Sequence, residues 1–178
     1  MLEGLSKLEY RGYDSAGIAV YNNNELEVAK SKGKLAVLSE KIDGGKKLGG
    51  NMGIGHTRWA THGEPSDVNA HPHLSQSGRF AVVHNGIIEN YISLKKKLES
   101  KGFEFISETD TEVIAHLFEY YYKGDIMDTM IKVINRVEGS YALVCFKIAV
   151  TSEAIKFSSS PRPTIIGLAF LTAINWSG

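Results

Sequence analysis

Along this chain, segments with the alternating hydrophobic pattern of strands and segments with the hydrophobic spacing of helices follow one another. Their order limits the folds that the chain can adopt. Apolar residues alternate with other residues around Ile18 and Val20 and again around Leu26 and Val28, and three asparagines stand between the two segments. This pattern predicts an antiparallel hairpin. Alternation or short apolar runs predict further strands at 52–59, 79–86, 103–107, 140–150, 154–157 and 164–174.

Helical spacing accounts for most of the other apolar residues. Leu2, Leu5 and Leu8 predict a short helix at the start of the chain. One later helix begins with the spacing of a capping box, Thr109 and Glu112. Strands and helices come in pairs rather than in strict alternation, which predicts an α+β fold. The longer helices are expected at 34–42, 88–98, 109–121 and 126–137.

The composition fits one domain over residues 1–178, because 43% hydrophobic residues in a chain of this length are enough to form a core. Twenty basic and twenty acidic residues cancel, so no overall field draws the protein to nucleic acid or to an anionic membrane surface. We therefore expect small molecules or proteins as partners, with no nucleic acid and no membrane. Zero net charge also gives no protection against self-association.

Cysteine usage and the N-terminal sequence favour a cytoplasmic protein. Cys145 is the single cysteine and cannot form an internal disulfide, which fits a reducing compartment. The chain starts without a basic-then-apolar leader. Its longest apolar run, 165–174, is about half of the roughly 20 residues that a membrane-spanning helix needs.

Residues 53–73, GIGHTRWATHGEPSDVNAHPH, contain four of the six histidines and Arg58. Three interpretations compete: a metal ion held by histidines, a charged small molecule held by Arg58, and an irregular polar loop. The histidines have neither an HExxH frame nor cysteine partners, so no metal site is predicted. An arginine at the end of an inner strand suits a carboxylate, which its guanidinium matches bidentately. The alternative for Arg58 is a surface ion pair.

Two further segments carry chemistry of their own. In HNGIIEN (84–90), Asn85 and Gly86 can place a side-chain amide and a backbone N–H side by side, as in an oxyanion hole. The alternative is a tight turn. Asp110 stands at the start of a predicted helix, where simple capping is the alternative. Together with Arg58, these groups suit an α-amino acid whose side-chain carbonyl is attacked.

Five segments carry a family resemblance: EYRGYDSAG (9–17), GHTRWATHG (55–63), NAHPH (69–73), HNGIIEN (84–90) and SETDTEVIAH (107–116). In this order and spacing they resemble the glutaminase (class II glutamine amidotransferase) domain of glutamine–fructose-6-phosphate aminotransferase (isomerising), also called glucosamine-6-phosphate synthase. The resemblance runs from residue 2 to about 143, and residues 144–178 match the family poorly. It implies an N-terminal-nucleophile hydrolase fold, which is a four-layer αββα sandwich.

The resemblance also implies roles for single residues. Arg58 would bind the α-carboxylate of L-glutamine and Asp110 its α-ammonium, while Asn85 and Gly86 would form the oxyanion hole. His71 resembles a residue near the active site and receives no catalytic role. No cofactor is expected. The pocket wall would be completed by Thr61, His62 and Gly63. The residue that helps to control the passage of ammonia would be Trp59.

One part of the family pattern is missing from the sequence as written. The family's nucleophile is a cysteine at the mature N-terminus, on a first strand of the CGI type, and this chain has neither. Cys145 lies in an apolar strand pattern, where burial keeps a thiol protonated and inert. We therefore expect an N-terminally truncated domain, with its first strand missing, that is catalytically incompetent alone.

Two functions remain open at this point. The first is a glutaminase domain that hydrolyses L-glutamine to glutamate and ammonia, with the ammonia converting fructose 6-phosphate to glucosamine 6-phosphate. That reaction requires a sugar-phosphate isomerase domain, absent here, in a full-length enzyme that we expect to be a homodimer. The second function is a non-catalytic glutamine-binding or interaction module that keeps Arg58 and Asp110.

Overall fold

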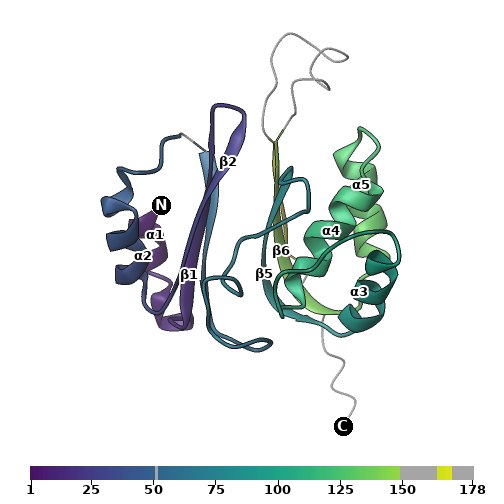
Figure 1. The fold of residues 1–178 in the computed structure, drawn as a ribbon, viewed down its shortest axis with the longest axis horizontal. Coiled ribbons are helices and arrows are strands. Elements are labelled where there is room, and N and C mark those ends of the chain that lie inside the picture. The colour runs from purple at the N-terminus through teal and green to yellow at the C-terminus, as the bar shows by residue number, and fades with distance from the viewer. Residues whose placement is uncertain (51, 149–163, 170–178) are drawn as a thin grey trace.

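Two antiparallel sheets form the centre of the molecule in the part of the chain that the structure describes (Figure 1). The structure is a computed structural model, and it describes residues 1–50 and 52–148 and the backbone of 164–169. The first sheet has the order β2-β1-β3 and consists of β1 (Ser15–Asn22), β2 (Glu25–Lys32) and β3 (Met52–Arg58). The second has the order β4-β5-β6-β7 and consists of β4 (His73–Leu74), β5 (Phe80–Ile88), β6 (Gly139–Lys147) and β7 (Thr164–Ala169).

The helices lie outside the pair of sheets, on both sides (Figure 1). No helix in the described ranges is both long and apolar enough to cross a membrane. The first sheet is covered by α1 (Leu2–Ser6) and α2 (Leu35–Lys41), and the second by α3 (Tyr91–Glu99), α4 (Thr111–Tyr121) and α5 (Ile126–Ile134). Short 3-10 turns occur at Glu9–Arg11 and Asp43–Gly45. The α+β prediction is confirmed.

The two sheets pack face to face through small and aromatic side chains. Ala19 and Ile54 of the first sheet contact Ala81, Val83 and Phe146 of the second. Because successive side chains of a strand point to opposite faces, the neighbours of Ala19 on β1 instead face α1 and α2. The same alternation on β3 places every second residue, from Ile54 to its end, on the face between the sheets.

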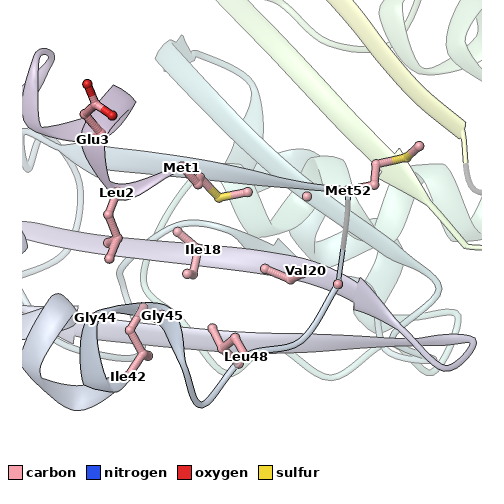
Figure 2. Close-up of a pocket in the computed structure, with 12 residues that line it drawn as sticks. Met1, Leu2, Glu3, Ile18, Val20, Ile42, Gly44, Gly45, Leu48 and Met52 are labelled. Atoms are coloured by element: carbon pink, nitrogen blue, oxygen red, sulfur yellow. The ribbon is translucent and has the colours of Figure 1, made fainter.

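A cavity of about 390 Å³, bordered mainly by apolar side chains and glycines, lies on the outer face of the first sheet, beside α1 (Figure 2). Ile18 and Val20 of β1 form its floor, and Met1 and Met52 border it. Glu3 is the one charged side chain among its described lining residues. Few of its side chains could therefore recognise a polar ligand.

The hairpin of β1 and β2 forms as the sequence predicts. Asn22 pairs with Glu25, so Asn23 and Asn24 alone make the turn. Both have positive φ, 47° and 67°, which is the conformation of a type I′ turn and one that asparagine tolerates. The local sequence therefore sets the register of the first sheet.

Helix α4 is the most deeply buried helix among those described. The predicted face, from Val113 to Phe118, packs against the second sheet and the neighbouring helices, and Tyr121 is partly buried. Ala115 and His116, on the other side of the helix, are buried as well. The helix is thus buried on more than one face.

The predicted strand at 103–107 is wrong, because side chains satisfy its backbone. The N–H groups of Ile106 and Ser107 donate to the carboxylate of Glu112, at 2.9 and 2.7 Å, and that of Glu104 donates to Gln76 Oε1. With these donors already paired, the segment runs in an irregular conformation. The predicted capping box is wrong for the same reason, since Glu112 reaches back to this segment and not to the first residue of its own helix.

Several boundaries also differ from the prediction. Helix α3 begins at Tyr91 rather than Ile88, because β5 continues to Ile88. Helix α5 ends at Ile134 rather than at residue 137. The predicted strand at 154–157 and the last five residues of 164–174 lie outside the described residues.

Candidate functional site

A second cavity, of about 310 Å³, opens where β3, β5 and the start of α4 meet. Polar and charged side chains contribute to its wall, which includes six of the eight site residues that the sequence predicts. His62 and Gly63 lie outside the wall. The lining residues are Arg11, His56, Arg58, Trp59, Thr61, His71, His84, Asn85, Gly86, Ile87, Thr109, Asp110 and Thr111.

Arg58 is the last residue of β3, and its side chain is buried between the sheets. Its Nη2 donates to the backbone carbonyls of His62 and Gly63. Its Nη1 is buried and has no hydrogen-bond partner in the described part of the chain. Burial lowers the pKa of Arg58, and the carboxylates of Asp110 and Asp14 act in the opposite direction. A buried guanidinium with a free N–H group is prepared to receive an anion, so the surface ion pair is the wrong interpretation.

Asp110 precedes the first residue of α4 and is buried. Its Oδ2 accepts a hydrogen bond of 2.8 Å from the N–H of Ile88, and its Oδ1 lies 3.5 Å from Thr111 Oγ1. Its side chain does not cap its own helix. Simple capping is therefore the wrong interpretation, and Asp110 instead connects α4 to the end of β5, with its carboxylate in the cavity wall.

Asn85 and Gly86 lie within β5, opposite Ala142 and Tyr141 of β6, so they do not form a tight turn. The side chain of Asn85 is exposed in the cavity wall, and its Oδ1 lies 2.9 Å from Nε2 of His56. Gly86 has φ 124°, and a Cβ there would lie 2.1 Å from the carbonyl oxygen of Ser140. Only glycine fits this position.

Behind these residues lie four buried histidines, of which His56, His71 and His84 line the cavity. His56 and His71 have ring centroids 4.4 Å apart, and His71 and His73 4.9 Å apart. The hydroxyl of Thr111 joins His71 Nε2, at 2.9 Å, to His84 Nδ1, at 2.8 Å. Burial lowers the pKa of each of the four rings, that of His84 to about 4, so the four imidazoles are uncharged near neutral pH.

The histidines of 53–73 do not share one irregular polar loop, which is one of the three interpretations of this segment. His56 lies on β3 and His73 on β4, both in the protein interior. His62 does lie in the loop, where its ring packs edge-on against Tyr91. The described residues contain no group of three or more histidine, cysteine or acidic side chains that could hold a metal ion.

Two side chains of the recognised motifs fix the loop beside Arg58. Asp14 accepts a hydrogen bond of 2.8 Å from the N–H of Ala60, and its own N–H donates to the carbonyl of Arg58. Asn69 donates to the carbonyl of Glu64 and accepts from the N–H of Glu108. Sequence reasoning missed both roles, although both residues lie inside the motifs that carry the resemblance.

The entrance of the cavity carries aromatic side chains. Trp59 lines the cavity and is 58% exposed, and Tyr13 packs against it at 5.6 Å between ring centroids. Thr61, also exposed, follows in the same loop. The indole thus borders the cavity and is also open to solvent.

Cys145 lies away from this cavity. It is on β6, opposite Val82, and is 1% exposed. Burial raises the pKa of its thiol well above the ordinary value. It is not a lining residue and cannot serve as the nucleophile there.

Comparison with known proteins identifies the family of this chain. Residues 56–155 match the family model of the glutamine amidotransferase domain. The glutamine–fructose-6-phosphate aminotransferase (isomerizing) of Caldanaerobacter subterraneus subsp. tengcongensis is 64% identical over 143 residues, which are 80% of this chain and 23% of that protein. The protein of the same name from Clostridium acetobutylicum is 60% identical over 95% of this chain and 28% of its own length. The chain thus spans about a quarter of the length of these relatives.

A solved structure is similar over most of the chain. The glutamine phosphoribosylpyrophosphate amidotransferase of B. subtilis, complexed with ADP and GMP, superposes with a TM-score of 0.70 at 30% identity. The match covers 83% of this chain and 33% of that one. Sequence, fold and the match over more than half of the residues lead to one conclusion: this chain belongs to the glutamine amidotransferase domain family.

Proposed function

We propose that this chain is a glutaminase domain that binds L-glutamine in the cavity at the ends of β3 and β5. The observation that carries the proposal is the unpaired, buried Nη1 of Arg58 in the same wall as Asp110 and Asn85. These groups offer a cation, an anion and an amide, which match the α-carboxylate, the α-ammonium and the side-chain carbonyl of glutamine. Membership of the glutamine amidotransferase family supports the same ligand.

Each predicted residue has a place in this proposal. Arg58 binds the α-carboxylate through Nη1, while the carbonyls of His62 and Gly63 hold its other nitrogen. Asp110 binds the α-ammonium. The Asn85 amide and the Gly86 N–H receive the carbonyl oxygen as charge develops on it. Thr61 completes the wall, and Trp59, which also lines the cavity, helps to control the passage of ammonia.

The larger protein and its fold are part of the same proposal. The order of helices and sheets supports a four-layer αββα sandwich of the N-terminal-nucleophile type, in one domain over residues 1–178. The names of the relatives support a partner domain that isomerises the sugar phosphate and uses the ammonia to make glucosamine 6-phosphate from fructose 6-phosphate. We place this enzyme in the cytoplasm, as a homodimer.

A binding experiment tests the ligand directly. Isothermal titration of the chain with L-glutamine should give saturable binding, and D-glutamine should bind much more weakly. Arg58→Lys should weaken binding by about 10- to 100-fold, because an ammonium cannot form the two-pronged contact of a guanidinium. Arg136→Lys is the matched control, since Arg136 is exposed and outside the cavity wall. Equal affinity of the parent and Arg58→Lys chains would refute the assignment.

A second assay tests the chemistry. Glutamate release from L-glutamine is compared between the chain and a version that carries a Cys-Gly-Ile strand ahead of residue 1. Release by the extended version alone supports a glutaminase whose nucleophile is an N-terminal cysteine. Release by the chain itself would show that another group attacks. Binding without release by either version would leave a glutamine-binding module.

A further inference from the structure

His56 contacts Asn85 across the space between the two sheets. His56 lies on β3 of the first sheet and Asn85 on β5 of the second, and Nε2 of the ring is 2.9 Å from Oδ1 of the amide. The histidine is 9% exposed, whereas the asparagine is open to the cavity. A buried, rigid ring thus holds one end of an exposed side chain that would otherwise be free to rotate.

We propose that His56 is a positioning residue that turns the Asn85 amide so that its NH₂ group, and not its oxygen, faces the ligand. The inference rests on the proposed function, in which Asn85 donates to the side-chain carbonyl of glutamine. His56 itself does not touch that carbonyl; it acts through Asn85.

The proton on the imidazole decides the orientation of the amide. If Nε2 carries the hydrogen, it donates to Asn85 Oδ1, and the NH₂ group is left for the cavity. If Nε2 carries only a lone pair, the amide must rotate to donate to it, and the oxygen then faces the ligand. An oxygen there would repel the carbonyl of glutamine, and more so as that carbonyl gains negative charge. The tautomer of His56 therefore determines whether the cavity offers a donor or an acceptor.

The surroundings of the ring favour hydrogen on Nε2. Nδ1 of His56 is buried and has no hydrogen-bond partner in the described part of the chain. A buried N–H without an acceptor is rarer in proteins than an unpaired acceptor, so the lone pair belongs at Nδ1. Burial and the nearby charge of Arg58 keep the ring neutral, so it carries one N–H group. The ring of His71, 4.4 Å away, packs against it and limits its rotation.

Nuclear magnetic resonance reads the tautomer without any ligand. In the ¹⁵N-labelled chain, long-range ¹H–¹⁵N correlations distinguish the protonated ring nitrogen from the bare one, and His56→Gln identifies the signals of His56 by their loss. We expect the Nε2–H form. The Nδ1–H form would overturn the inference. Because this measurement needs no glutamine, its outcome is independent of whether the proposed ligand binds.

Three variants test the consequence for binding. His56→Leu removes the donor and should weaken L-glutamine binding about five- to tenfold and shift the NH₂ resonances of Asn85. His56→Gln retains an N–H donor of similar reach and should restore binding to within about twofold of the parent. His73→Leu is the control, because His73 is also buried, at 2% against 9% exposed for His56, does not line the cavity, and contacts Thr109 and not Asn85.

The pattern of results separates positioning from a merely structural role. His73→Leu should leave the NH₂ resonances of Asn85 in place, whereas His56→Leu should move them. If His56→Leu keeps the parent's backbone spectrum and affinity, or if His56→Gln fails to restore binding in a folded chain, the inference is wrong. If the parent chain does not bind L-glutamine at all, the proposed function fails, and the tautomer alone decides between the two orientations of Asn85.

Discussion

At Gly86 the backbone leaves no room for a side chain, and this can be tested. Its φ of 124° is a conformation that L side chains rarely adopt, and a Cβ would meet Ser140 O at 2.1 Å. Gly86→Ala should lower the free energy of unfolding by about 3 kcal/mol or more, because conformational strain and the clash add. Urea unfolding followed by circular dichroism measures the change.

A second glycine allows the cost of the steric clash to be separated from the cost of the backbone strain. Gly102 has φ 89°, but a Cβ added there would meet nothing within 4 Å. Gly102→Ala should therefore cost only about 1 kcal/mol. Similar losses in the two variants would mean that β6 approaches Gly86 less closely than in this structure.

Some residues of the candidate site could be predicted from the sequence, and the others could be identified only from the fold. Arg58, Asp110 and Asn85 could be chosen from the sequence because each stands where a predicted strand ends or a helix begins. The role of His56 could not, because it depends on β3 and β5 meeting from different sheets. Periodicity says that His56 faces the same side as Arg58, but not which residue lies opposite.

At the scale of elements, the link between residues 103–107 and α4 depends on one carboxylate. Burial raises the pKa of Glu112, but His116, 3.5 Å away, and the N–H groups of Ile106 and Ser107 outweigh it and lower the pKa to about 2. Since the folded-state pKa lies below the ordinary 4.5, the ionised group stabilises the fold above pH 4.5. This contribution should disappear as the pH falls from about 4.5 to about 2.

Unfolding measured at several pH values tests this contribution. Between pH 5 and pH 2.5 the parent should lose about 2 to 3 kcal/mol of stability through Glu112. Glu112→Gln should be less stable at pH 5 and should show a flatter dependence on pH. Glu104→Gln, at an exposed position, serves as the control. An unchanged pH slope in Glu112→Gln would contradict the assignment.

Elements whose conformation follows from their own sequence were predicted well. A segment whose conformation depends on hydrogen bonds to side chains elsewhere in the chain was not. The β1–β2 hairpin follows from its asparagines and its alternation. The strand expected at 103–107 has the right alternation, but its donors are taken by Glu112 and Gln76. The sequence of these five residues does not show that side chains elsewhere in the chain bind their backbone N–H groups in place of a neighbouring strand.

At the scale of the whole molecule, Cys145 reports on opening of the core. It is the only cysteine of the chain, it is 1% exposed, and burial raises the pKa of its thiol. A thiol reagent at pH 8 should label the folded chain at least about a hundredfold more slowly than the urea-unfolded chain. Fast labelling of a chain with native circular dichroism would place Cys145 near the surface.

The candidate site is divided between the two sheets, and this has a consequence for stability. Arg58 and His56 come from the first sheet, and Asn85 and Gly86 come from the second. Neither sheet alone can hold the ligand, so any ligand that contacts both also bridges them. Its binding energy opposes their separation: at a concentration one hundred times the Kd, it would add about 2.7 kcal/mol to the free energy of unfolding. A cell rich in the ligand would thus keep more of this protein folded.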